Sequence, residues 1–410
     1  NFKYQSLGPL AEKTIMIELI KVAFKKVGFE ITRYNPNDHS AKFASLKTKS
    51  QYKGDMLISF TVNPFLLKEG EAFTNAHIVD WECFQIAKIF LDLGYSIDVI
   101  DFNNLSFTPK KDYSILLDVS YNLDRIAPYL KRDCIKILYP KFGHWLSHNT
   151  AGYSRCLALR QRKGIVLRPL RLLRPNLAVE HSDYIILRGA EFSRNSYGYI
   201  QKPTFHVHQG TITLFPWPEN KDYDGARKNF LFLGGSDLVH KGLDLALDAF
   251  AKMPEYHLYI CAALEKEKDF EQAFHKELYE TSNIHTIGWM DITSPEFTQL
   301  MNKCLCLINP SCCEMSCGSV RDCMQGGVIP IISYESDVDV HDFGITLETT
   351  SVEEIRSVVK RISDFPTEDL KGMSRRAWEF ARQSYTKDRF IEEFKSAVLK
   401  ILGMSQGDAE

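Results

Sequence analysis

The most constraining feature of this sequence is an alternation of strand-sized apolar runs and helix-sized segments that begins twice along the chain. The first series opens with the strand Asp55–Val62, the helix Val79–Leu93 and the strand Ser96–Asp101. A strand, a helix and a second strand in this order form a βαβ unit, whose two strands lie parallel in one sheet. The series then predicts four more strands: Tyr113–Val119, Cys134–Tyr139, Tyr184–Leu187 and Thr204–His208.

The second series follows Phe215–Lys228, a break rich in proline and charge, and opens with the strand Phe230–Leu233. The predicted helices are Leu243–Met253, Phe270–Glu280, Pro295–Asn302 and Ser319–Gln325, and the predicted strands are His257–Cys261, Ile284–Ile287, Leu305–Asn309 and Val328–Ile332. Strands that alternate with helices of about 10 residues are typical of a doubly wound α/β domain.

The two series divide the chain of 410 residues into four parts. We expect an N-terminal helical extension and linker over 1–50, α/β domains over 51–220 and 221–385, and a C-terminal helix over 386–410. The predicted fold class is therefore α/β, with two Rossmann-like doubly wound domains facing a cleft. The chain begins with Asn1 rather than Met, and we expect it to be part of a longer polypeptide.

Charge and cysteine content restrict the class of protein further. The net charge is −2, so general polyanion binding is not expected, and no apolar run reaches the roughly 18 residues of a membrane span. Six of the ten cysteines lie between Cys304 and Cys323 without a C-x-x-C pair. We interpret them as buried free thiols of a cytoplasmic protein, with a metal site as the alternative.

The loop after the strand Phe230–Leu233 is the first candidate for chemistry. Gly234, Gly235 and Ser236 come directly after the strand, and Lys241 lies near the start of the next helix. Glycines let backbone N–H groups approach a ligand, and a lysine beside a helix N-terminus favours an anion. The alternative is an ordinary turn with a solvated lysine.

The loop after the strand Leu305–Asn309 is the second candidate. Glu314 lies before a helix, and Asp322 follows eight positions later, inside that helix. The small residues Ser316, Gly318 and Ser319 would let a phosphate approach the helix N-terminus. Alternatively, Glu314 caps the helix and Asp322 is an exposed helix charge.

This second region resembles the retaining GT-B glycosyltransferases of family 4, also called group 1. That family carries two acidic residues eight positions apart in a P-S-x-x-E context, followed by a P-V-I strand. Here the matching residues in order are Pro310, Ser311, Glu314, Asp322, Met324, Gly326 or Gly327, Pro330 and Ile331. The resemblance covers about Asp55–Leu402. It departs from the family at Asp322, shorter than the usual glutamate, at Met315 in place of glycine, and at Gly235-Ser236 where many members have an arginine.

The resemblance implies a nucleoside diphosphate sugar as donor, bound by the second domain, and an acceptor bound by the first. In this resemblance the diphosphate is held by the loop after the first strand and by the start of the later helix: Gly235, Ser236, Lys241, Ser316, Gly318 and Ser319. Glu314 binds the sugar, and Asp322 binds the ribose. Trp289 lies against the base. The resemblance places Asn75 and His77 in the acceptor-side loop and His144 facing the donor sugar, with His181 as another candidate. It implies transfer with retention of configuration, no cofactor and no metal.

A basic segment in the first half is not explained by this resemblance. Seven cations fall within 20 residues: Arg155, Arg160, Arg162, Lys163, Arg168, Arg171 and Arg174. A solvated helical face is one interpretation, and a contact with an anionic membrane surface or a lipid-diphosphate acceptor is another. Nucleic acid is disfavoured because aromatic residues do not interleave with the cations.

From this resemblance we expect a glycosyltransferase acting on a glycan or lipid-linked acceptor, in bacterial surface polysaccharide or glycoconjugate synthesis, cytoplasmic or peripheral at the inner face of the membrane. Two alternatives remain open on the same fold. One is a non-catalytic module of a larger synthase that binds a sugar nucleotide or glycan. The other is a nucleotide-sugar epimerase.

Overall fold

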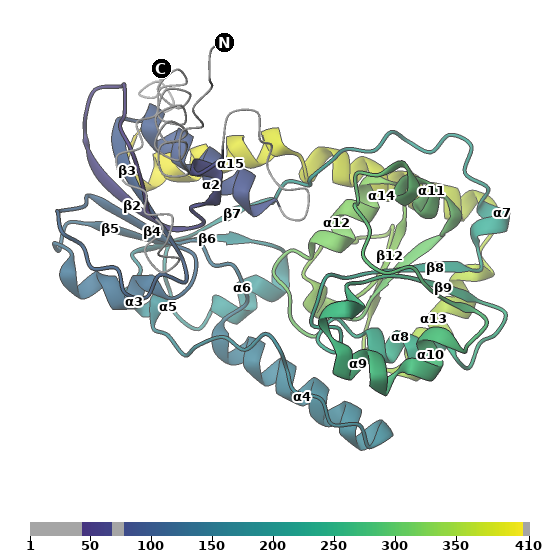
Figure 1. Ribbon diagram of the computed structural model, residues 1–410. Coiled ribbons are helices and arrows are strands. Elements are labelled where there is room, and N and C mark those ends of the chain that lie inside the picture. Colours follow the sequence, from purple (N-terminus) through teal and green to yellow (C-terminus); the bar gives the residue numbers. More distant parts are fainter. Residues whose placement is uncertain (1–42, 68–77, 405–410) are drawn as a thin grey trace, which may run out of the picture.

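The computed structural model describes residues 43–67 and 78–404, which form two α/β domains joined side by side (Figure 1). Residues 1–42 of the predicted N-terminal extension and the candidate residues Asn75 and His77 lie outside the described residues. No helix in the described ranges combines the length and apolar character needed to cross a lipid bilayer.

The first domain contains a seven-stranded sheet of order β1-β3-β2-β4-β5-β6-β7. Its strands are β1 (Phe43–Leu46), β2 (Gly54–Phe60), β3 (Tyr95–Asp101), β4 (Ile115–Asp118), β5 (Ile135–Leu138), β6 (Tyr184–Arg188) and β7 (Thr204–Val207). All neighbouring pairs are parallel except β1 and β3, which are antiparallel. The expectation of a linker was wrong at β1, because Ala44 and Leu46 are buried in the domain core.

Helices cover this sheet and also extend from it. They are η2 (Asn63–Phe65), α2 (Val79–Asp92), α3 (Asn122–Ile126), η3 (Ala127–Tyr129), α4 (Trp145–Lys163), α5 (Ala178–His181) and α6 (Glu191–Tyr197). The helix α4 runs toward the second domain and ends at Gly164, whose φ of 73° is left-handed and whose N–H bonds to the carbonyl of Arg160 (Figure 1).

The second domain contains a six-stranded sheet of order β10-β9-β8-β11-β12-β13. Its strands are β8 (Asn229–Leu233), β9 (His257–Cys261), β10 (Ile284–Thr286), β11 (Cys306–Asn309), β12 (Ile329–Ser333) and β13 (Ile345–Leu347). All its strand pairs are parallel. Because β8 and β11 are neighbours, the loops that follow them emerge at the same edge of the sheet and face the first domain.

The second-domain helices include several with side-chain caps. They are α7 (Tyr223–Ala226), α8 (Leu243–Phe250), η4 (Leu264–Lys266), α9 (Lys268–Ala273), α10 (His275–Tyr279), α11 (Pro295–Lys303), α12 (Gly318–Gln325), η5 (Tyr334–Ser336), α13 (Val352–Ser363) and α14 (Thr367–Ser384). Ser294 caps α11 by accepting from the N–H of Phe297, and Ser351 caps α13 by accepting from the N–H of Glu354.

The chain passes between the domains at two places that lie together. The first is the segment after β7, and the second lies between α14 and α15 (Lys387–Ile401). The N–H of Thr211 in the first crossing bonds to the carbonyl of Tyr385 in the second, at 3.1 Å. Gln325 of α12 bonds to both crossings, since its amide donates to Thr211 and to the carbonyl of Tyr385.

The last helix, α15, belongs to the core of the first domain although it follows the second (Figure 1). Phe390 and Phe394 are fully buried. The Phe390 ring packs against Trp81 of α2, and the Phe394 ring packs edge-on against Tyr139 after β5. The chain thus begins and ends its described structure in the same domain.

Candidate functional site

A cleft with a volume of about 400 Å³ lies between the two domains and is lined by residues of both. From the second domain come the loops after β8, β10 and β11 and the start of α12. From the first come the start of α2, the segment after β5, α4 and the segment that follows it. The carboxyl ends of parallel strands are where open α/β sheets bind their ligands.

An ion pair between the two predicted loops lies in this cleft. The ammonium of Lys241, after β8, lies 2.5 Å from Oε1 of Glu314, after β11. The hydroxyl of Ser311 donates to the same carboxylate oxygen at 3.0 Å. Both charged side chains are about 10% exposed, so the pair is largely removed from water but still faces the cleft.

The two charges stabilise one another. Burial alone would raise the pKa of Glu314, but Lys241 and the nearby Arg171 outweigh it and lower that pKa to about 2. Burial opposes the charge of Lys241, yet Glu314 keeps its pKa above the ordinary value. Both groups are therefore ionised at neutral pH.

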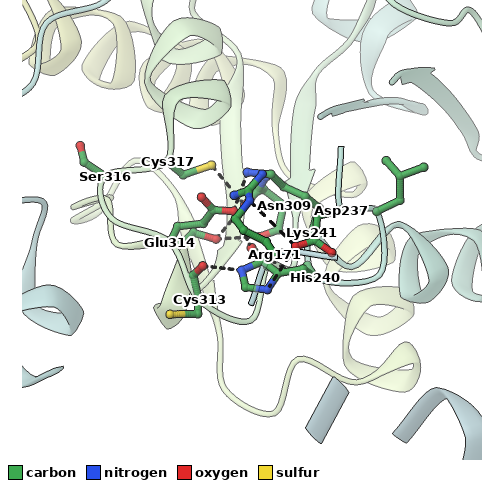
Figure 2. Close-up of polar contacts among 12 residues, drawn as sticks. Arg171, Asp237, His240, Lys241, Asn309, Cys313, Glu314, Ser316 and Cys317 are labelled. Atoms are coloured by element: carbon green, nitrogen blue, oxygen red, sulfur yellow. Dashed lines mark hydrogen bonds and ion pairs between the residues drawn. The ribbon is translucent and has the colours of Figure 1, made fainter. Parts of the chain in front are cut away.

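His240 connects the loop after β8 to the loop after β11 through hydrogen bonds next to this pair (Figure 2). Its Nε2 lies 2.5 Å from the carbonyl of Cys313, and its own carbonyl accepts from the N–H of Cys312. Burial lowers the pKa of His240 to about 3, so the ring is neutral, and Nε2 must carry the proton that faces the carbonyl. His240 positions Lys241 and Glu314 rather than titrating near neutral pH.

The helix α12 begins at the cleft. Gly318 and Ser319, its first two residues, line the cavity, and Ser316 precedes them with a left-handed φ of 55°. The first N–H groups of a helix have no partners within the helix, so an anion is stabilised there. Asp322, one turn further on, also lines the cavity, and burial raises its pKa to about 6.

The structure brings together the predicted donor-side residues. Gly235, Ser236 and Trp289 line the cleft with Lys241 and Glu314. Trp289 is 58% exposed and lines the cleft, so much of its side chain is accessible to a ligand. Two alternatives from the sequence are wrong, because Lys241 is not solvated and Asp322 is not an exposed helix charge.

His144 was expected to face the donor, but it does not line this cleft. It immediately precedes α4, and its ring packs against Tyr197 and Tyr199 beside a separate, smaller pocket. The histidine that reaches the cleft is His148, one helical turn later on α4. His181 is exposed at the end of α5 and lies apart from the cleft lining.

His148 is 1% exposed and carries a hydrogen bond that fixes the neighbouring segment. Its Nε2 lies 2.8 Å from the carbonyl of Arg171, while its Nδ1 is buried without a partner in the described residues. Burial lowers its pKa, so the ring is neutral at physiological pH. One feature of the sequence could have indicated His148: it lies four positions after His144, which is one helical turn further along.

The domain contact includes a buried carboxylate that the sequence analysis did not single out. Asp337, after β12, accepts hydrogen bonds from the N–H groups of Ala190 (2.9 Å) and Ser193 (3.1 Å), and from the Ser193 hydroxyl. It also accepts from the N–H of Ser316 at 3.3 Å, in the loop that carries Glu314. One side chain therefore ties α6 of the first domain to the predicted donor loop.

The basic segment contributes to the domain contact as well as to the surface. Arg162 and Lys163 at the end of α4 form ion pairs of 2.6–2.7 Å with Asp244, Asp248 and Glu277 of the second domain. Arg171 lines the cleft. The interpretation of the whole segment as a solvated helical face was therefore wrong for these three cations.

Comparisons with known proteins agree with this architecture. No protein-family model and no curated protein sequence matches the chain. HepE from Anabaena, solved with UDP-glucose, is 12% identical with a TM-score of 0.53, and the match covers 86% of this chain and 100% of that one. Sucrose-phosphate synthase from Thermosynechococcus elongatus is 11% identical with a TM-score of 0.58, over 86% and 99%. A glycosyltransferase from Rickettsia africae is 12% identical with a TM-score of 0.56, over 87% and 100%.

At such low identities the similarity is one of fold. Two Rossmann-like domains, whose sheets are parallel except for the β1–β3 pair, face a common cleft, which confirms the predicted GT-B fold class.

Proposed function

We propose that this chain is a glycosyltransferase that moves a sugar from a nucleoside diphosphate sugar to a glycan or lipid-linked acceptor. The observation that carries the proposal is the buried Lys241–Glu314 pair beside the N-terminus of α12, inside a cleft between two Rossmann-like domains. A cation and free N–H groups suit a diphosphate, and a carboxylate suits sugar hydroxyls. The similarly folded HepE was solved with UDP-glucose, which supports the same class of donor.

The donor would lie along the second-domain face of the cleft. In this pose Glu314 accepts hydrogen bonds from sugar hydroxyls and Asp322 accepts them from the ribose. Trp289 lies against the base at the outer end. Gly235 carries no side chain, and a Cβ there would meet no atom within 4 Å, so the loop after β8 leaves room for the phosphates.

Bond breaking leaves negative charge on the diphosphate. Lys241 and the first N–H groups of α12 would stabilise this charge as it develops, and such preorganised donors are worth about 3–4 kcal/mol each in comparable sites. The loops are held in place before the donor arrives, because His240 and Asp337 fix their backbones. In this scheme the leaving group is held by protein groups, without a metal ion.

The acceptor would enter from the first domain and attack the anomeric carbon from the face that the diphosphate leaves. Its hydroxyl proton would pass to the departing diphosphate oxygen, and attack from that same face retains the configuration at the anomeric carbon. The ion pairs of Arg162 and Lys163 and the contacts of Asp337 hold the domains together and keep bulk water from the oxocarbenium-like state.

We also propose that the surface beside the cleft contacts anionic membrane lipid, where a lipid-linked acceptor would be presented. Leu157, Val166 and Leu170 are 44–74% exposed there, with Arg160 and Arg168 between them in the sequence. Such mixed surfaces bind interfaces by apolar insertion and by attraction to anionic headgroups. Flotation with phosphatidylglycerol vesicles, compared with phosphatidylcholine vesicles, tests this contact.

Thermal unfolding in the presence of UDP, GDP and dTDP tests the donor assignment first. A nucleotide present at 100 times its Kd would stabilise the protein by about 2.7 kcal/mol, and the base that stabilises most identifies the donor class. Hydrolysis and transfer assays with the matching sugar nucleotides then test catalysis. Loss of turnover in Glu314→Gln, with nucleotide binding retained, supports the enzyme.

A non-catalytic binding module is the second candidate, because the loop after β8 lacks the expected arginine. Tight nucleotide binding without turnover of any donor in a broad acceptor panel would favour that module. Absence of binding to every nucleoside diphosphate would overturn both functions.

A further inference from the structure

Two cations on the first-domain side of the cleft are only weakly compensated among the described residues: Lys141 has no ion pair there, and Arg171 has a single long one, with Asp237 at 4.0 Å. Lys141 follows β5, and Arg171 lies in the segment after α4. Both line the cavity that holds the Lys241–Glu314 pair. The third first-domain cation in this lining, Arg188, is instead paired with buried Glu82 and donates to the carbonyl of Pro140.

The ammonium of Lys141 is held over aromatic rings rather than carboxylates. It lies 4.4 Å from the ring centre of Phe102 and 5.6 Å from that of Phe142. Burial is the main cause that lowers its pKa to about 8, with the positive charges of Arg188 and Arg171 adding to it. Asp101 and Asp80 act in the opposite direction without offsetting these effects.

Arg171 is positioned by its backbone, while its guanidinium forms only one long ion pair among the described residues. Its carbonyl is held by the His148 ring at 2.8 Å. Its nearest carboxylate oxygen in the described structure is that of Asp237, 4.0 Å from Nε. The side chain is 29% exposed, and it faces the cleft close enough to Glu314 to lower the pKa of that carboxyl.

Two half-buried cations that repel one another are costly unless an anion lies between them. A phosphate group would compensate both charges, since its oxygens can accept from the arginine fork and from the lysine ammonium together. The donor diphosphate already has a cation and a helix N-terminus on the second-domain face. Lys141 packs on the ring of Phe102 after β3, on the opposite side of the cleft.

We propose that Lys141 and Arg171 form a phosphate subsite for the acceptor, which would therefore carry a phosphate group near its attacking hydroxyl. This inference rests on the proposed glycosyltransferase function and narrows its acceptor class. The phosphate can belong to a soluble sugar phosphate or to a lipid headgroup, and both present the same oxygens to the two cations.

Titration of the nucleotide-saturated protein with glycerol 1-phosphate, followed by ³¹P NMR, tests the subsite. We expect binding that weakens at least tenfold in Lys141→Gln and in Arg171→Gln, with nucleotide affinity changed less than twofold. Lys141→Arg should restore binding, which a merely structural role of the position would not predict. Lys131→Gln removes an exposed lysine of the same domain and serves as the control.

The pH dependence gives an independent readout. Phosphate affinity should fall as the pH rises above about 8 in the wild type, because Lys141 loses its proton, and should not fall there in Lys141→Arg. The charged groups that act on Lys141 are Arg188, Arg171, Asp101 and Asp80.

Vesicles identify the source of the phosphate. Binding to phosphatidic acid in phosphatidylcholine that depends on Lys141, without binding of glycerol 1-phosphate, assigns the subsite to a lipid headgroup. Unchanged affinity for both probes in Lys141→Gln overturns the inference. A parallel loss of nucleotide and phosphate binding in Arg171→Gln also overturns it, because Arg171 would then serve the donor. Failure of the proposed function is seen separately, as absence of nucleotide binding in the wild type.

Discussion

The Lys241 ammonium and the Glu314 carboxylate lie 2.5 Å apart, although 73 residues separate them in the sequence. They meet because β8 and β11 are parallel neighbours, so the loops that follow these strands share one edge of the sheet. A ligand that binds both groups must exchange this ion pair for its own contacts. Under the proposed function, the pair contributes to the stability of the empty site and favours ligands that carry both anionic groups and hydroxyls.

Removing one member of this pair should destabilise the protein more than removing both. We expect Glu314→Gln to lower the free energy of unfolding by about 3 kcal/mol, because Lys241 is left buried without its partner. The double variant with Lys241→Met should recover most of that loss, as measured by urea denaturation. Glu335→Gln, a carboxylate after β12 outside this pair, is the control. A loss in the double variant equal to the sum of the losses in Glu314→Gln and Lys241→Met would mean that the pair contributes no coupling.

The same pair predicts acid sensitivity. The pKa of Glu314 is about 2 in the folded protein and about 4 in an unfolded chain, so ionisation stabilises the folded state at neutral pH. This contribution should be lost as the pH falls from about 4 toward 2. The difference in unfolding free energy between wild type and the double variant should shrink over that range, and a constant difference would contradict the assignment.

Asp322 predicts a second pH effect, on donor binding. Its pKa of about 6 means that it is protonated in the empty site just below this pH, whereas accepting hydrogen bonds from ribose favours the carboxylate. Affinity for the best sugar nucleotide should therefore fall as the pH is lowered through about 6. A sugar nucleotide is used because its diphosphate diester does not titrate there. Asp322→Asn should bind more weakly at pH 7.5 and show no such fall, and an unchanged profile in this variant would remove Asp322 from the site.

Asp337 should control how the two domains sit together. Asp337→Ala leaves the N–H groups of Ala190 and Ser193 without their acceptor at the domain contact, which should cost about 2–4 kcal/mol of unfolding free energy. The radius of gyration from small-angle scattering should increase and transfer should slow. Asp342→Asn, an exposed carboxylate of the same domain, should change neither quantity. A destabilised variant with unchanged scattering and unchanged rate would limit Asp337 to folding.

The proposed handling of the leaving group predicts independence from divalent metal. Transfer measured in excess EDTA should keep its rate, because Lys241 and the start of α12 hold the diphosphate. Loss of transfer that added Mg²⁺ restores would show that a metal ion shares this work.

The fold and the second-domain half of the site were predictable because their signals are local. The loops after β8 and β11 each follow a short apolar strand, and strand neighbours bring such loops together whatever the intervening sequence. The boundaries were less reliable where helices are short, as in Phe270–Glu280, which the structure divides into α9 and α10. The short strand β1 was missed because lysines flank its four residues.

The first-domain half of the site was harder to predict, because it depends on which way side chains of α4 point and on contacts between segments that are distant in the sequence. A single turn of α4 decides that His148 rather than His144 reaches the cleft. In the sequence, Arg171 is one of seven cations with nothing to distinguish it. The structure shows that Arg171 lines the cleft, whereas Arg162 forms an ion pair with Asp244 of the second domain. Lys141 and Asp337 have no sequence signal of their own, since their surroundings come from other elements.

Because α15 packs in the first domain, that domain cannot complete its core until the C-terminal end of the described chain has been synthesised. The ribosome synthesises the first sheet before α15. The apolar surface that Phe390 and Phe394 cover therefore stays exposed until the second domain has been synthesised. A split version of the protein, cut before α15, should recover its stability when the missing helix is supplied in trans as a separate peptide.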